Sequence, residues 1–223
     1  MKNDKTMERD PFDMLKDICT TACHTRHACA EGYRAMLAAE NVSQLMAVWR
    51  ANWEDLVESK YADIINDQLP ALYLDPTLKT EMNAAGIYVN ECPQTAPEYV
   101  LVIVTDHDGI VDINDYAKCY VLGKAWVRAW DHAQVYSEKN DRAIIMLYDY
   151  SYGHVSKGEV VALGHSRLWT STNAALNGSV TCEAHGGELR VSSYLKIEAY
   201  GDTKIFSKTD RNITFFGNAK IIV

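Results

Sequence analysis

The stretch GKAWVRAWDHAQVYS, from Gly123 to Ser137, decides the fold, because it repeats one short pattern nearly twice. The two units are Gly123-Lys-Ala-Trp-Val-Arg-Ala-Trp and Asp131-His-Ala-Gln-Val-Tyr-Ser. Each unit begins with Gly or Asp and carries a small or apolar residue at its third, fifth and seventh places. The stretch therefore indicates an internal repeat with a period of eight residues.

The same octad extends over the C-terminal half of the chain. Further units begin at Asp115, Asp141, Gly178, Gly201 and Gly217. About fifteen octads fit between residue 99 and the end of the chain, with slips of a residue or two near Lys139, Gly158, Asn177 and Gly187. The repeat is therefore the main structural element of this half.

The octad has a simple physical meaning. Its third, fifth and seventh places share one face of a β-strand, so they predict a narrow inward stripe. The leading Gly or Asp marks a corner, because Gly tolerates a positive φ and Asp bonds its own backbone in turns. Because the period is even, the same octad places face inward on both sides of every corner. A two-residue hairpin would reverse the inward and outward faces from strand to strand, so the pattern favours a coiled β-solenoid over a meander with such hairpins. A rung of two octads is expected, and a triangular rung of three octads stays open.

The N-terminal region has a helical pattern of apolar residues from about Pro11 to Gly86. Ser43 is a candidate N-cap, and Asp75 is a second one, followed by Pro76 at the first helical position. Gly86 supplies a left-handed exit from that last helix. About four or five short helices are expected. Their predicted starts lie near Phe12, Cys29, Ser43, Tyr61 and Pro76.

Together these patterns predict an α+β protein. A small helical N-terminal domain, residues 1–98, precedes and caps a β-solenoid of eight-residue repeats, residues 99–223. Solenoid ends carry unpaired backbone groups, so the last helix and the strand-like GIYVNE, Gly86–Glu91, are expected to cover the first rung. The last rung, GNAKIIV from Gly217 to Val223, is a candidate homodimer surface.

Composition narrows the partners and the location. The net charge of the 223 residues is -8, which opposes general nucleic-acid binding, since that requires Lys and Arg to replace counterions. No apolar run approaches the ~18 residues of a membrane span, and the polar start MKNDKTMERDPFDML predicts a cytoplasmic protein. The six cysteines are expected to be free thiols. Most of the excess acid lies in residues 1–98, where a solvated surface is the simpler explanation and a basic partner the alternative.

Aromatic residues occupy many outward places of the octads, and Tyr and Trp far outnumber Phe. Such residues combine a large apolar ring with a polar handle, which suits a surface that meets a protein partner. Cross-strand stacking that stiffens the sheet is the equally simple alternative. The expected recognition wall comprises Trp126, Trp130, Tyr136, Tyr148, Tyr150, Tyr152 and Trp169, with the three tryptophans as its anchors.

No metal site, cofactor or catalytic residue is expected. Cys19, Cys23 and His27 have helical spacing, and such ligands bind zinc, but they lack a close CxxC pair and a second half of the motif. Cys119 and Cys182 fall on inward fifth places and are expected to be small core residues. The histidines at 132, 154, 165 and 185 occupy different octad positions, so no row of histidines is expected along the solenoid.

The sequence resembles a group of uncharacterised octapeptide-repeat proteins of gut bacteria and their phages. The resemblance rests on the octads, on the helical sequence from Ala28 to Ile65 and on the strand GIYVN, Gly86–Asn90. The resemblance covers most of the chain, although these octads are more degenerate than the A-T-V-x-A-Y-G-N pattern of the group. It implies no enzyme activity and no catalytic residue. It favours a phage or mobile-element protein that acts by binding.

The function expected from these observations is that of a non-catalytic, cytoplasmic protein-binding or scaffold protein. The more specific hypothesis is a phage or mobile-element factor that inhibits or sequesters a host component. A self-assembling structural rod is one alternative. A solenoid enzyme, or a carbohydrate binder that uses the aromatic wall, is another.

Overall fold

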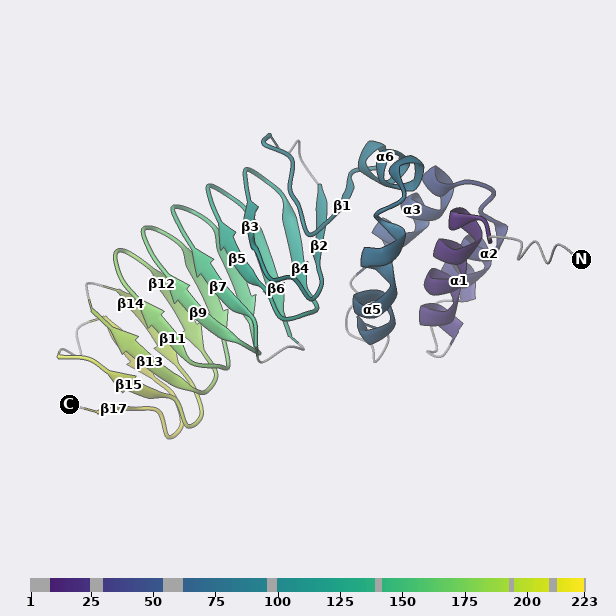
Figure 1. The fold of residues 1–223 in the computed structure, drawn as a ribbon. Coiled ribbons are helices and arrows are strands. Elements are labelled where there is room, and N and C mark those ends of the chain that lie inside the picture. The colour runs from purple at the N-terminus through teal and green to yellow at the C-terminus, as the bar shows by residue number, and fades with distance from the viewer. Residues whose placement is uncertain are drawn as a thin grey trace, which may run out of the picture. The chain divides into compact units, whose positions relative to one another are not determined.

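The computed structural model describes residues 9–24, 30–53, 62–95, 100–138, 142–192, 195–208 and 212–222. Internal contacts divide the chain into two compact units, Met1–Ala85 and Gly86–Val223. The first unit is helical and the second is a β-solenoid (Figure 1). The chain is therefore an α+β protein in which a helical region is followed by a solenoid of eight-residue repeats.

The described part of the first unit forms helices that begin close to the predicted starts. They are α1 (Pro11–His24), α2 (Ala30–Ala38), α3 (Val42–Ala51), α5 (Ala62–Leu72) and α6 (Pro76–Ala84). Asp75 caps α6 by accepting a hydrogen bond from the Leu78 N–H, and Gly86 has the expected positive φ of 75°.

The N-cap predicted for α3 at Ser43 is wrong, because the helix begins at Val42. Asn41 is the N-cap: its backbone is extended, and its side chain accepts the Gln44 N–H at 2.9 Å. The amide of Gln44 in turn accepts the backbone N–H of Glu40 at 2.9 Å, which fixes the entry of the chain into the helix. Ser43 therefore lies inside the first turn.

The second unit contains two parallel sheets. The even-numbered strands and β1 form a nine-stranded sheet, here called sheet A, and the other odd-numbered strands form an eight-stranded sheet, here called sheet B. Sheet A comprises β1 (Ile87–Val89), β2 (Leu101–Val104), β4 (Lys118–Val121), β6 (Gln134–Ser137), β8 (Tyr152–Val155), β10 (Arg167–Thr170), β12 (Thr181–Ala184), β14 (Lys196–Ala199) and β16 (Ile213–Phe215). Sheet B comprises β3 (Ile110–Ile113), β5 (Trp126–Ala129), β7 (Ile144–Leu147), β9 (Glu159–Ala162), β11 (Ala174–Leu176), β13 (Glu188–Val191), β15 (Lys204–Phe206) and β17 (Lys220–Ile222).

Each turn of the solenoid uses two octads, one in each sheet. Cys119 of β4 pairs with Val135 of β6, sixteen residues later in the chain, and the strand between them belongs to the opposite sheet. The rung is therefore two-sided, as expected, and the triangular alternative is excluded. Successive turns follow one another along the two sheets (Figure 1).

The inward stripe forms the core between the sheets. Ala125, Val127 and Ala129 are at most 1% exposed and belong to one continuous apolar cluster. Small residues fit there because the two walls of each rung lie close together. Cys119 and Cys182 are buried in this cluster, and burial raises the pKa of Cys182 to about 12. Both cysteines are therefore core residues, as predicted.

The corners that lead into sheet A have the predicted left-handed backbone. Asp115, Asp131 and Asp149 have φ values between 54° and 56°, and Gly164 takes the same place in a later turn with a φ of 67°. Asp is among the few residues with a side chain that adopt this region readily. The first place of the octad is thus a corner, as predicted.

The turns differ in length, because the octads are separated by insertions and deletions. Val135 pairs with Gly153, eighteen residues later, whereas Leu168 pairs with Cys182, fourteen residues later. The slip expected near Lys139 falls outside the described residues. The paired residues still face inward in both the long and the short turns. The extra or missing residues therefore lie in the segments between the strands.

The solenoid unit begins earlier than the expected domain of residues 99–223. β1, which the sequence analysis places in the helical domain, pairs with β2 and so extends sheet A by one strand. A cap of helices over the first rung and a dimer surface at Gly217–Val223 stay predictions. No helix in the described ranges is long and apolar enough to cross a membrane.

Candidate interaction surface

The predicted aromatic wall is divided between the two sheets. Trp126, Trp130, Tyr148 and Tyr150 lie on sheet B and the corner that follows it, whereas the remaining three residues lie on sheet A. Those three are Tyr136, Tyr152 and Trp169. Because the inward faces of the sheets share one core, their outward faces point in opposite directions. The wall is therefore two separate surfaces.

Sheet A carries a continuous ladder of stacked rings, one from each successive turn. Neighbouring ring centroids are 4.1–6.1 Å apart, and the planes differ by 3–28°. The ladder consists of Tyr120, Tyr136, His154, Trp169, His185, Tyr200 and Phe216. Tyr152 meets the ladder edge-on, with its ring 6.1 Å from that of Tyr136.

The four histidines do not follow one another in a row, but they enter two aromatic rows between other rings. His154 and His185 belong to the ladder, and His185 Nε2 lies 2.6 Å from the Glu183 carboxylate. His132 and His165 alternate with tyrosines in a second stack at the corner before sheet A, with ring centroids 5.1–5.7 Å apart. Like octad places meet in both stacks over most turns: His132 and His165 each follow a corner residue directly, and His154 pairs in register with Trp169.

The ladder geometry favours the stiffening interpretation for sheet A. Each inner ring has its two faces against the rings above and below, so only ring edges point outward. Sugars and nucleobases bind by stacking on a free aromatic face. The ladder therefore offers little to a carbohydrate ligand, and we assign it to the stability of the sheet.

Replacing Trp169 with alanine is expected to lower the free energy of unfolding by about 1–3 kcal/mol, because two ring pairs of about 0.5–1.5 kcal/mol each are lost. The pairs are those with His154 and His185, at 4.1 and 5.1 Å. Urea denaturation of the variant and of the exposed control Arg167→Ala on the same strand measures the effect. Equal stability of the two variants would contradict a structural role for the ladder.

Sheet B carries a different surface over its first three strands. Ile110, Trp126 and Ile144 are aligned in register, and the first two side chains are 50% and 44% exposed. Asp112, Arg128 and Met146 form the next row. We define the β3–β7 face as Ile110, Asp112, Trp126, Arg128, Trp130, Ile144, Met146 and Tyr148.

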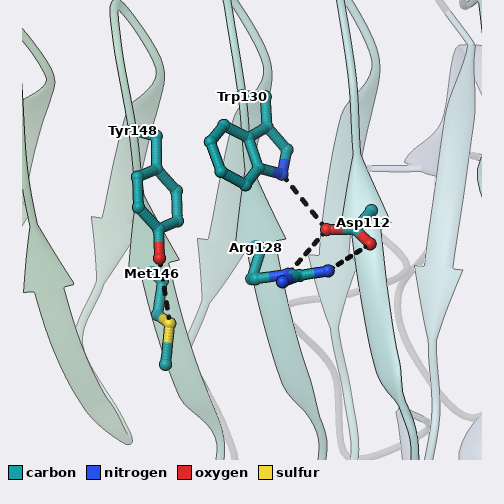
Figure 2. A network of polar contacts seen from close by, with 5 residues as sticks. All are labelled: Asp112, Arg128, Trp130, Met146 and Tyr148. Atoms are coloured by element: carbon teal, nitrogen blue, oxygen red, sulfur yellow. Dashed lines mark hydrogen bonds and ion pairs between the residues drawn. The ribbon is translucent and has the colours of Figure 1, made fainter.

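A polar network fixes the centre of this face (Figure 2). Arg128 donates two hydrogen bonds to the Asp112 carboxylate, at 2.7 and 2.6 Å, and the Trp130 Nε1–H donates a third at 3.1 Å. Partial burial alone would raise the pKa of Asp112, but the bonds from Arg128 and Trp130 outweigh it and lower that pKa. Asp112 therefore remains charged and holds both partners in place.

Stacking fixes the adjoining part of the face. The rings of Trp130 and Tyr148 lie 4.0 Å apart and nearly parallel, and the Tyr148 hydroxyl donates to the Met146 sulfur at 3.4 Å. Side chains that are already ordered lose less conformational entropy when a partner binds. The face is thus preorganised over three consecutive turns of the solenoid.

A shallow hollow of about 550 Å³ adjoins the β3–β7 face. Its walls come from the segment after β1, from β3, and from the side chains of Arg128 and Trp130. The lining residues are Asn90, Glu91, Cys92, Gln94, Ile110, Val111, Asp112, Asn114, Arg128 and Trp130.

The three residues with metal-ligand spacing, at which no site is expected, are only partly covered by the described residues. Cys19 is buried in α1, whereas the side chain of Cys23 and all of His27 lie outside the described residues. Within the described part of the chain, no group of three or more His, Cys, Asp or Glu side chains is placed to hold a metal ion.

Comparisons with protein-family models, curated proteins and solved structures give no match to this chain. Of the residues of this face, the sequence indicated Trp126, Trp130 and Tyr148. It did not indicate the other five, which are Ile110, Asp112, Arg128, Ile144 and Met146. These residues occupy outward places at equivalent positions of neighbouring turns. Once it is known which turns pair, the sequence therefore places them on one face.

Proposed function

We propose that this chain is a non-catalytic protein-binding protein whose partner binds the β3–β7 face. The observation that carries the proposal is an exposed, preorganised surface made of Trp, Tyr, Met, Arg and Ile side chains. Trp, Tyr, Met and Arg are enriched at protein interfaces, and Trp, Tyr and Arg dominate the binding energy there. Trp126 and Trp130 remain the proposed anchors.

The charge of the face supports a protein partner over a nucleic acid. Its base, Arg128, is held by its acid, Asp112, so the face carries no net positive charge. Phosphate binding gains most of its energy from Lys and Arg that replace counterions. An apolar protein surface gains instead from burial against Ile110, Trp126 and Ile144.

The resemblance to octapeptide-repeat proteins of gut bacteria and their phages supports a more specific proposal. The partner is a host protein, and the chain inhibits or sequesters it as a phage or mobile-element factor. We propose a cytoplasmic location, which is supported by the free thiols of Cys92, Cys119 and Cys182.

Site-specific photocrosslinking tests the proposal. Benzoylphenylalanine replaces Trp126 on sheet B or, as the control, Arg167 on sheet A; each residue opens a four-residue strand with the same burial pattern. The probes are irradiated in extracts of a gut bacterium, with and without phage infection. We expect one protein to be crosslinked from position 126 and not from position 167.

Competition establishes that the crosslink reports a specific surface. An excess of untagged wild-type chain is expected to abolish the crosslink, whereas the same excess of a folded Trp126→Ala, Trp130→Ala variant leaves it intact. Equal crosslinking from the two sheets, or equal competition by the variant, would overturn the assignment of the β3–β7 face.

A further inference from the structure

Among the residues that the structure describes, no strand pairs with the outer edge of β3, the first strand of sheet B. β3 is the last strand at its end of sheet B, whereas β2 in sheet A is covered by β1. Edge strands with free backbone groups are templates for another strand. The hydrogen-bond pattern of the solenoid shows which backbone groups of β3 are available along this edge.

The pattern shows which backbone groups point out of the edge. On sheet B the outward residues direct both N–H and C=O toward the preceding turn, as in the bonds Trp130 N to Ile113 O and His107 N to Lys124 O, both 2.9 Å. By the same parity, Ile110 and Asp112 point their N–H and C=O groups away from β5. Neither residue has a backbone hydrogen-bond partner on this side among the described residues.

The hollow of about 550 Å³ lies beside this edge, with Asn90, Glu91, Cys92 and Gln94 forming its other wall. These four residues lie outside the strands, and Pro93, between Cys92 and Gln94 in the chain, has no N–H to donate to a ladder. The hollow falls within the range of volumes that hold bound ligands. The described residues therefore leave space next to β3 and place no strand in it.

We propose that an extended segment of the protein partner adds to the open edge of β3 as a parallel strand, an inference that rests on the proposed function. Backbone hydrogen bonds supply the affinity of such strand addition, and alternate side chains supply the specificity. The register of sheet B then defines the chemistry of the segment.

The residue opposite Ile110 continues the row of Ile110, Trp126 and Ile144, so it is apolar. The residue two places later lies opposite Asp112, near Glu91 in the same hollow, so it is basic. Arg128 neutralises Asp112 only from the β5 side. The expected segment is thus an extended apolar-x-basic sequence.

Hydrogen exchange tests whether the edge is open in the free protein. The amides of Ile110 and Asp112 are expected to exchange much faster than those of Val111 and Ile113, which point toward β5. A probe peptide, acetyl-Thr-Ile-Ala-Arg-Ala-Thr-amide, should then slow the exchange at Ile110 and Asp112. Equal protection of all four amides in the free protein would overturn the inference.

Two N-methylated peptides test the pairing itself. In the proposed register, the alanine after arginine directs its N–H to the Asp112 carbonyl, whereas the arginine N–H points away from β3. Methylation of that alanine nitrogen is expected to weaken binding about tenfold, and methylation of the arginine nitrogen to leave it unchanged. Fluorescence anisotropy measures the three affinities.

A protein variant provides an independent readout. Ile110→Pro removes an N–H that faces the open edge and leaves the ladder with β5 intact, so the fold is retained and binding is lost. Failure of the parent peptide to bind at millimolar concentration, or equal affinities of the two methylated peptides, would overturn strand addition. If crosslinking from position 126 persists in that case, the proposed function stands without this binding mode.

Discussion

Replacing Ile145 with alanine is expected to lower the free energy of unfolding by about 2–5 kcal/mol. The Ile145 side chain is fully buried on β7, where it pairs in register with Val127 on β5 and Val160 on β9. The backbone ladders on both sides prevent the rung from collapsing, so a cavity would remain. Urea denaturation followed by circular dichroism measures the loss.

Ile144 provides a matched control, because it is the adjacent residue of the same type and points outward from the same strand. Ile144→Ala removes the same atoms from a partly exposed position, so its cost is expected to stay below about 1 kcal/mol. Similar losses in the two variants would contradict the inward and outward assignment of β7.

Replacing Gly187 with alanine is expected to destabilise the solenoid by about 3–5 kcal/mol, because a positive φ and a backbone clash add together. Gly187 has a φ of 75°, and a Cβ there would lie 2.4 Å from the carbonyl oxygen of Thr172. That atom belongs to the backbone of the preceding turn. It cannot move aside as a flexible side chain would.

A second variant, at Gly201, measures the cost of the positive φ without the backbone clash. The φ of Gly201 is 61°, but a Cβ there would lie 3.9 Å from the nearest atom, the His185 carbonyl oxygen. Gly201→Ala is therefore expected to cost only the positive φ, about 1–2 kcal/mol. Denaturation midpoints of both variants measure the difference, and a Gly201 variant as unstable as the Gly187 variant would refute the clash.

Local patterns in the sequence were enough to predict the main architecture. The parity of Ala125, Val127 and Ala129 defined the inward stripe, and the leading Asp131 marked a corner that the structure shows with a φ of 56°. Asp75 and Pro76 likewise marked the start of α6. These features depend on the backbone preferences of a few adjacent residues, so a short stretch contains the information for them.

The candidate site could be predicted only in part. Trp126, Trp130 and Tyr148 were named because aromatic residues at outward places are visible in single octads. Asp112 was missed, because its role depends on Arg128 and Trp130 from the next turn of the solenoid. The edge of β3 was missed as well, since the repeat pattern does not show that Gly86–Thr95 adds only one strand, β1, in sheet A.

By itself, the sequence determined which residues face the core, where the chain turns and that the repeats coil into a solenoid. The tertiary structure alone decided which outward residues meet. The turns vary from fourteen to eighteen residues, and Trp169 stacks both on His154, its partner in register, and on His185, which lies two residues beyond its other partner Glu183. Inward parity is a local property of each strand, whereas the register between turns depends on the total length of every insertion between them.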